Sequence, residues 1–300
     1  MSVGDYGHEL EFGSFITPAN HDPAGVVALA EHSEIVGLDL VTFQDHPYQP
    51  SFLDSWTLLS FVAGRTERVK LAPNVLNLPL RKPGVIARAV ASLDRLSRGR
   101  VELGLGAGAF WDAIVAMGAE RLTPGESVTA LGEAIEIIRG LWDTGNPARL
   151  DIQGDHHEVS GAKRGPAPAH DVEIWLGAYK PRMLRMVGQK ADGWLPSLGY
   201  LKSVEELAAS NARIDDAAAG AGRQPGDIRR LLNINGRFTE AETDGLLTGP
   251  PTQWAEQIAD LALGFGMSTF ILGSDHPAEL ATFGQEVAPA ARELVASERG

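Results

Sequence analysis

The sequence contains no cysteine, and this absence removes several kinds of chemistry at once. Without thiols the chain cannot form disulfides, use a thiolate nucleophile or hold zinc or iron–sulfur centres through cysteine. Hydrophobic runs are also short: none approaches the about 18 residues that a membrane helix needs. The segment Met1 to Glu11 is polar and acidic and lacks the basic start of a signal peptide. We therefore expect a cytoplasmic protein that does not contact membranes.

Positive charge is scarce as well. The chain has 26 Lys and Arg against 39 Asp and Glu, which gives a formal net charge of −13. Nucleic acids and anionic membrane surfaces bind clustered Lys and Arg, so neither is an expected partner. An anionic ligand would have to be held locally, by backbone amides or a few cations. We expect the partner to be a small-molecule substrate.

The chain does contain a regular alternation of short apolar strands and helices. The first unit is a strand at Phe12–Thr17, followed by Asp22 and Pro23 as N-cap and first residue of a helix that ends near Gly37. Further strands are expected at 38–43, 69–76, 101–105, 172–176, 193–195, 231–235 and 269–272. Further helices are expected at 55–65, 83–97, 125–142, 181–190, 204–219, 252–263 and 277–296. Eight such units predict an α/β fold, a (β/α)8 TIM barrel forming a single domain over residues 1–300.

One segment interrupts this alternation. Residues 143–171, rich in Gly, Pro and His, follow the fourth helix, whose start carries a capping box at Thr123-Pro-Gly-Glu126. Short strand patterns at 150–152 and 157–159 predict a hairpin within it. We expect an inserted excursion between helix 4 and strand 5 rather than a domain boundary.

In a barrel of this kind the active site lies at the carboxyl ends of the strands. Polar residues and glycines follow most of the predicted strands here, whereas the strands themselves are apolar. These residues are Thr17, Gln44, Asp45, His46, Asn74, Asn77, Gly106, Ala107, Gly108, Gly177, Ala178, Lys180, Pro196, Ser197, Asn235, Gly273 and Ser274. The contrast is typical of a solvent-facing pocket above a packed barrel.

Asp45 and His46 end the second predicted strand. An imidazole there can exchange a proton near neutral pH, and a carboxylate can orient a partner. The alternative is that Asp45 caps the following loop and His46 is an ordinary surface histidine. From the dipeptide alone this alternative is favoured.

The run Gly104-Leu-Gly-Ala-Gly108 has three interpretations. It permits the G-x-G-x-x-G/A dinucleotide pattern, but it follows the fourth strand and no acidic residue ends a convincing second strand. The glycines could relieve crowding at the barrel rim. They could also form, with Gly177-Ala178, a cradle of amides for an anion, near Lys180 and Arg182.

Other features suggest little chemistry. His156-His157 lacks spaced acidic or cysteine partners, so we expect no metal site. No Gly-x-Ser-x-Gly elbow or Walker loop occurs. Among the tryptophans, only Trp111 and Trp194 adjoin glycine-bearing strand ends and could line a pocket.

Several segments together resemble the luciferase-like oxidoreductase superfamily. They occur in the family's order over nearly the whole chain, at 91–108, 124–126, 133–142, 175–178 and 191–194. The resemblance implies a (β/α)8 barrel, often a homodimer, that binds FMN or the deazaflavin F420 at the strand carboxyl ends.

The resemblance also implies roles for individual residues. It places the cofactor phosphate near Gly106, Ala107, Gly108, Gly177 and Ala178, with Lys180, Arg182 and Trp194 nearby. It implies a bulge with a non-proline cis peptide at Asn74-Val75, which with Asn77 would form the platform under the flavin ring. Asp45-His46 matches the pair of the F420-dependent members, in which His serves proton transfer and Asp contacts the deazaflavin.

One departure concerns the substrate. Members that oxidise a sugar phosphate carry a glutamate directly after Gly-x-Gly of strand four, where this chain has Ala109-Phe110-Trp111. We therefore expect an oxidoreductase or monooxygenase acting on a small apolar substrate, although Phe110 and Trp111 could instead pack under the excursion. The alternatives are a non-catalytic flavin-binding protein on the same barrel and a lyase using Lys180 as a Schiff base.

Overall fold

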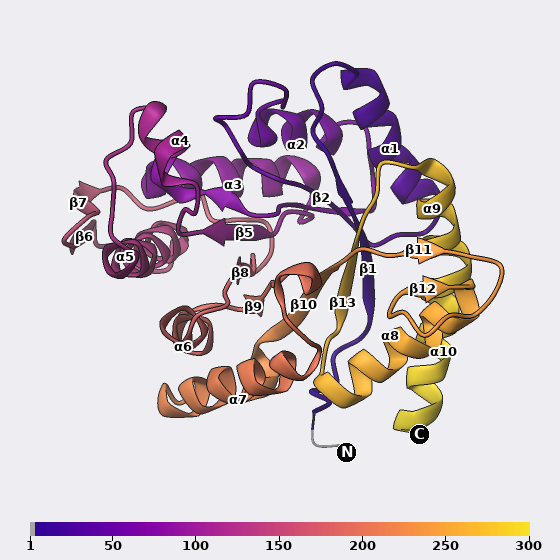
Figure 1. Ribbon diagram of the computed structural model, residues 1–300. Helices are drawn as coiled ribbons and strands as arrows, with labels where there is room; N and C mark the ends of the chain where they lie inside the picture. The colour runs from indigo at the N-terminus through magenta and orange to yellow at the C-terminus, as the bar shows by residue number, and fades with distance from the viewer. Residues whose placement is uncertain (1–3) are drawn as a thin grey trace.

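Buried parallel strands form the centre of the computed structural model, which describes residues 4–300 (Figure 1). The strands are β1 (Glu11–Ile16), β2 (Leu40–Phe43), β3 (Lys70–Pro73), β4 (Leu76–Asn77), β5 (Leu103–Gly106), β8 (Ile174–Leu176), β9 (Gly193–Trp194), β10 (Arg229–Ile234) and β13 (Thr269–Gly273). They pair in the order β3-β2-β1-β13-β10-β9-β8-β5-β4. Because Leu71 of β3 also pairs with Val101 just before β5, the sheet closes on itself. The predicted TIM barrel is confirmed.

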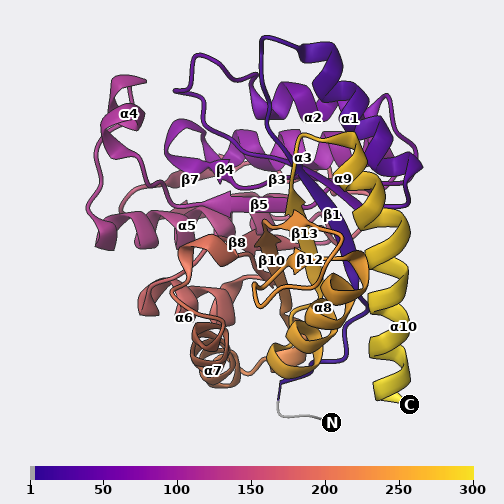
Figure 2. The same ribbon diagram turned by 45° about the vertical axis from the view of Figure 1, so that its right-hand side comes forward.

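Helices surround the barrel, as Figure 2 shows from a second direction. They are α1 (Pro23–Ile35), α2 (Ser55–Ala63), α3 (Pro83–Ser97), α4 (Trp111–Ala116), α5 (Pro124–Trp142), α6 (Pro181–Lys190), α7 (Glu205–Gly220), α8 (Pro251–Phe265), α9 (Pro277–Thr282) and α10 (Ala288–Arg299). The Asp22 carboxylate accepts from Gly25 N, and the Thr123–Glu126 capping box is formed. The predicted starts of these two helices are thus confirmed.

The last predicted helix differs from expectation. Instead of one helix over 277–296, a π-helical turn at Phe283–Val287 separates α9 from α10. Pro289 follows this turn and lacks the N–H that a continuous helix would use at that position, so a widened turn fits the sequence there.

The excursion forms the expected hairpin, β6 (Leu150–Gln153) with β7 (Glu158–Ala162), whose strands pair antiparallel. The Glu133 carboxylate of α5 accepts three backbone N–H groups from the hairpin turn at 155–157. The sequence patterns did not reveal α4 or the two-residue parallel strands β11 (Arg237–Phe238) and β12 (Thr248–Gly249), because such short elements show no periodicity.

Two apolar layers position the strand ends. A small cluster fills the barrel interior, made of Leu40, Ala72, Trp175, Leu195, Leu231 and Ile271, with Phe15 and Val75 packed against it. A much larger cluster lies between the strands and the surrounding helices. The carboxyl ends of the strands are therefore held in place by close-packed apolar side chains on both sides of the sheet. Within residues 4–300, none of the helices combines the length and apolar content needed to cross a membrane.

Candidate functional site

The third strand of the barrel is broken near its carboxyl end. β3 stops at Pro73, the peptide bond between Asn74 and Val75 is cis, and β4 resumes at Leu76. This is the bulge that the resemblance implied. It raises Asn74 and Val75 at the mouth of the barrel, among the other strand ends.

Asn74 is held by a network of buried polar side chains. Its amide exchanges two hydrogen bonds with the Asn233 amide of β10, of 2.7 and 3.0 Å, and donates to Thr42 Oγ1 at 3.3 Å. Asn233 also donates to Ser197 Oγ at 3.1 Å. The site prediction omitted Asn233 and Thr42. A polar residue inside an otherwise apolar strand, as in Leu231-Leu-Asn-Ile, was the available signal.

Of the three interpretations of the glycine run, the structure supports relief of crowding between neighbouring strands. A Cβ at Gly104 would overlap the Pro73 carbonyl oxygen, and one at Gly106 would lie 2.7 Å from Val75 Cγ2. The space beside both glycines is therefore filled by the bulge of the neighbouring strand. A Cβ at Gly177 would lie 3.9 Å from the same methyl, which is an ordinary contact, so Gly177 also adjoins Val75. These glycines shape the platform, and a contact between Gly106 and a cofactor phosphate would have to come from its backbone.

The Asp45 carboxylate is almost completely buried, with 2% of the residue exposed. It accepts from Arg81 Nη2 at 2.8 Å, from Arg81 Nε at 3.2 Å and from the backbone N–H of Asn77 at 2.8 Å. Arg81 also bonds Asp54. The carboxylate thus ties the end of β2 to β4, and the geometry favours a positioning role over the expected direct contact with substrate or cofactor. Sequence reasoning missed Arg81.

His46 lies in a different environment from its neighbour. Its ring stacks near Tyr48 at 5.4 Å and Phe52 at 6.4 Å between centroids, and Phe110 meets it edge-on at 5.4 Å. Burial lowers the pKa of His46 below its ordinary 6.5, while the Asp45 charge opposes this. A lowered pKa favours the neutral imidazole, which is the form that can accept a proton.

The other predicted residues lie along the ends of β8 and β9. Trp194 is fully buried and donates from Nε1 to the Ala178 carbonyl at 2.9 Å, so it supports the Gly177-Ala178 turn from below. Lys180 and Arg182 are exposed at the start of α6, whose N-terminus has no side-chain cap. Tyr179, which the prediction omitted, accepts from Ser197 N at 2.7 Å.

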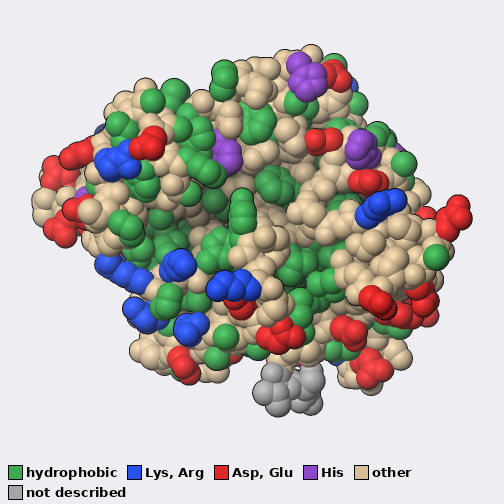
Figure 3. Space-filling view, viewed as in Figure 1, with side chains coloured by type: hydrophobic (Ala, Val, Ile, Leu, Met, Phe, Trp, Pro, Cys, Tyr) green, Lys and Arg blue, Asp and Glu red, His purple; other side chains and the backbone are tan. Residues whose placement is uncertain are grey.

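Figure 3 shows how side-chain types are distributed on one face of the molecule. Hydrophobic side chains surround a hollow near the middle of this view, and Lys and Arg gather at the lower left, where Figure 1 places α6 and α7. Lys180 is exposed at the uncapped start of α6, and Arg182 in the first turn donates to Thr129 Oγ1 of α5 at 3.0 Å, so this helix start carries positive charge on an acidic protein. An anionic group attached to a ligand in the barrel mouth would be attracted there.

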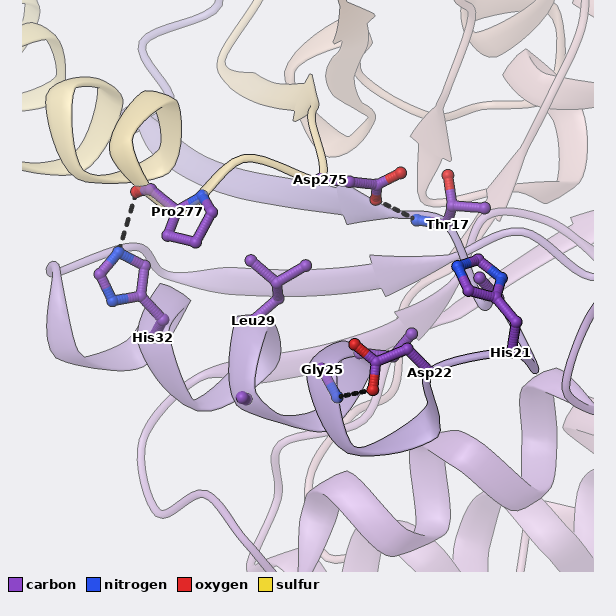
Figure 4. Close-up of a pocket in the computed structure, with 11 residues that line it drawn as sticks. Thr17, His21, Asp22, Gly25, Leu29, His32, Asp275 and Pro277 are labelled. Carbon is purple, nitrogen blue, oxygen red and sulfur yellow. Dashed lines mark hydrogen bonds between the residues drawn. The ribbon is translucent and has the colours of Figure 1, made fainter.

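Two cavities lie on the opposite side of the mouth. One, of about 360 Å³, is bounded by the ends of β1, β2, β10 and β13 and includes Thr17, Gln44 and Asn235. The other, of about 560 Å³, runs outward over α1. Figure 4 shows this second cavity, with Thr17, His21 and Asp275 at one end and His32 at the other. Of the described residues that line either cavity, none is Lys or Arg.

The platform also offers an unused acceptor. Asn77 Oδ1 is buried and has no hydrogen-bond partner among residues 4–300, although a buried polar atom without a partner is costly. A flavin or deazaflavin ring carries an N–H donor and a broad apolar face. The unpartnered Asn77 Oδ1 could accept from that N–H, and the apolar Val75 is two residues away in the same segment. Together with the cationic start of α6, these residues fit a flavin or deazaflavin cofactor.

Comparisons with known proteins agree with this arrangement. Residues 10–244 match the family model described as luciferase-like monooxygenase. The chain is 33% identical over 238 residues to the F420-dependent glucose-6-phosphate dehydrogenase of Nocardia farcinica, which covers 75% of this chain and 68% of the relative. It is 30% identical over 237 residues to the protein of the same name from Mycolicibacterium gilvum, with the same coverage.

Solved structures share the fold. An F420-dependent secondary alcohol dehydrogenase, in complex with an F420–acetone adduct, superposes with a TM-score of 0.82 at 17% identity over 95% of this chain and 99% of that one. The coenzyme F420-dependent tetrahydromethanopterin reductase of Methanopyrus kandleri gives 0.80 at 19% identity, covering 94% and 99%. At these identities the likeness concerns the fold alone. The matched relatives are named as enzymes, which does not favour a non-catalytic binding protein.

Proposed function

The chain belongs to the luciferase-like monooxygenase family, and on this premise we propose that it is an F420-dependent oxidoreductase acting on a small uncharged alcohol or its carbonyl product. The observation that carries the proposal is the position of His46, which lies half-buried among the rings of Tyr48, Phe52 and Phe110 and follows Asp45, whose carboxylate holds the backbone of Asn77. The names of the relatives support F420 over FMN, which the sequence alone left open.

The residues form two groups: a platform for the ring of the cofactor and a second site for its anionic, phosphate-bearing tail. Val75 and Asn77 would support the ring, with Asn77 Oδ1 as an acceptor, while Asn74 is held in place by Asn233. The backbone around Gly106–Gly108 and Gly177–Ala178, with Lys180 and Arg182, would hold the anionic tail. The bound deazaflavin supplies hydride transfer, which no side chain can provide.

His46 would handle the proton that accompanies this transfer. When an alcohol becomes a carbonyl compound, its hydroxyl proton must leave, and a neutral imidazole is the suitable acceptor. The Asp45–Arg81 pair fixes the start of the loop that carries His46. The rings of Tyr48 and Phe110 contact the His46 ring and would border a substrate placed beside it.

The substrate is proposed to differ from that of the named relatives. A sugar phosphate needs cations for its phosphate, yet the rings that surround His46 are those of Tyr48, Phe52 and Phe110. Ala109 also replaces the glutamate expected of sugar-phosphate oxidising members. An uncharged substrate fits the aromatic surroundings of His46 better.

Cofactor titration followed by turnover tests the proposal. Purified protein is titrated with F420 and with FMN, and binding is followed by fluorescence. We expect F420 to bind at least tenfold more tightly, and simple secondary alcohols, but not glucose 6-phosphate, to reduce it. Tighter binding of FMN, with oxygen consumption on its reduction, would show a flavin monooxygenase instead.

The expected homodimer and cytoplasmic location stay predictions, which size-exclusion chromatography and cell fractionation check.

A further inference from the structure

An apolar segment directly after the glycine run is only partly packed. Phe110 is 55% exposed and Met117 53%, whereas Ile114 of α4 is fully buried. Gly108 has a positive φ of 94°, and a Cβ there would lie 2.7 Å from Pro79 and 3.2 Å from the Trp111 ring. A side chain at position 108 would therefore collide with Pro79 and crowd Trp111, whereas Phe110, two residues further along, is exposed.

The Phe110 ring faces the proposed proton acceptor rather than the core. Its aromatic contacts among the described residues are with His46, at 5.4 Å and 66° between ring planes, and with Tyr48, at 6.1 Å. The sequence left open whether Phe110 packs under the excursion. Its exposure and its contact with His46 instead place it beside the reacting position.

We propose that Phe110 is a specificity-determining residue that selects substrates carrying an apolar ring or branched alkyl group next to the carbinol carbon. With Tyr48 and Phe52 it forms an aromatic wall around His46. A large exposed phenyl ring gains stability when an apolar group covers it, and it offers no hydrogen bond to a sugar hydroxyl. The inference rests on the proposed function, since it assigns the substrate class of the same site.

The chemistry at this wall is balanced by the groups already named. Bound F420 in its oxidised form would supply the hydride acceptor for a secondary alcohol, taking the carbinol hydrogen with both electrons of the broken C–H bond. The hydroxyl proton passes to the His46 imidazole and then to solvent, and the C=O double bond forms. Phe110 takes no part in these transfers: it holds the apolar substituent so that the hydroxyl lies toward His46.

Variants at position 110 and on the same segment test the proposal. Phe110→Ala, Phe110→Leu and the control Met117→Ala are compared with wild type, using 2-propanol, cyclohexanol and 1-phenylethanol. Met117 is equally exposed and lies on the same segment, but it has no role in the site. We expect Phe110→Ala to lower kcat/KM for 1-phenylethanol about 10- to 30-fold, mainly through KM, with less than about threefold loss for 2-propanol. Phe110→Leu restores part of the loss.

Two further readouts separate a substrate-binding role from a merely structural one. Removing the ring exposes His46 to water, so the acid limb of the pH profile should move up toward 6.5 in Phe110→Ala. Binding of acetophenone to the F420-loaded protein, measured by calorimetry, should weaken in Phe110→Ala and stay unchanged in Met117→Ala.

The outcomes distinguish this inference from the proposed function. Equal loss for all three alcohols, or a loss matched by Met117→Ala, would overturn the role of Phe110 while leaving the F420 chemistry intact. A wild-type protein that oxidised no alcohol would show that the proposed reaction is wrong. If acetophenone binding still depended on Phe110 in that case, the role of Phe110 in binding apolar groups would be retained. Acetophenone binding that is indifferent to Phe110 would overturn the site itself.

Discussion

Two neighbouring residues at the end of β2 have opposite environments. Asp45 points into the protein, against Arg81 and the backbone of Asn77, whereas His46 stands among aromatic rings at the mouth. Adjacent residues commonly point to different sides of the chain, so one sequence pair can serve two tasks. The carboxylate is thus bonded to the protein around it, whereas the imidazole is the group to which we assign the proton transfer.

Replacing His46 tests this division at the residue scale. We expect His46→Ala to lower turnover at least about 10²-fold, because the hydroxyl proton loses its acceptor, while the F420 dissociation constant changes less than about threefold. His156→Ala, a histidine on the β6–β7 hairpin, serves as the control. In wild type the acid limb of kcat/KM should lie below pH 6.5, since burial lowers the His46 pKa, and it should vanish in the variant. Unchanged turnover would remove His46 from the mechanism.

At the scale of elements, strand β5 is shaped by the bulge between β3 and β4. Gly104 and Gly106 have no side chain because Pro73 and Val75 already occupy the space. Close backbone approach is one of the few reasons that require glycine inside a strand. The motif that first suggested a nucleotide cradle thus has a packing role as well.

Alanine substitutions separate the three glycines by their neighbours. Gly104→Ala should cost about 3 kcal/mol or more, because its Cβ would meet a backbone carbonyl that cannot move. Gly106→Ala should cost about 1–3 kcal/mol, and Val75→Ala in that background should recover part of it by removing Cγ2. Gly177→Ala, whose nearest contact of 3.6 Å is ordinary, should change the unfolding free energy by less than about 0.5 kcal/mol. Denaturant unfolding measures each variant. Full recovery of Gly104→Ala by Val75→Ala would contradict this account, because the Pro73 carbonyl would still occupy the space of the new Cβ.

At the scale of the whole molecule, the base of the barrel carries buried charge. His170, at the end of the excursion, contacts Asp94 at 2.9 Å and Glu102 at 3.4 Å, and both carboxylates are almost fully buried. The hydrogen bond to Glu102, followed by that to Asp94, raises the pKa of His170 to about 9 despite partial burial. This ion cluster joins the returning excursion to α3 and to the start of β5.

The raised pKa predicts how stability depends on pH. Between pH 6.5 and about 9 the folded state holds a proton that the unfolded chain releases, so the stabilisation is complete below pH 6.5 and is lost as pH rises through 9. Because the imidazole is partly exposed, we expect a loss of roughly 1 kcal/mol, less than the full shift implies. Unfolding free energies at pH 6 and 9.5 should show this loss in wild type and not in His170→Asn. An equal fall in both proteins would assign the pH dependence to other groups.

The sequence by itself determined the barrel, the hairpin and the helix starts, because hydrophobic period and capping residues act locally. It also indicated the cis bulge at Asn74-Val75, through family resemblance. Only the tertiary structure decided what meets at the mouth: the Asn74–Asn233 pair spans 159 positions, and Arg81 reaches Asp45 across 36. Phe110 beside His46 is likewise a long-range contact. Such contacts depend on which strand ends the closed barrel brings together, and no local pattern records them.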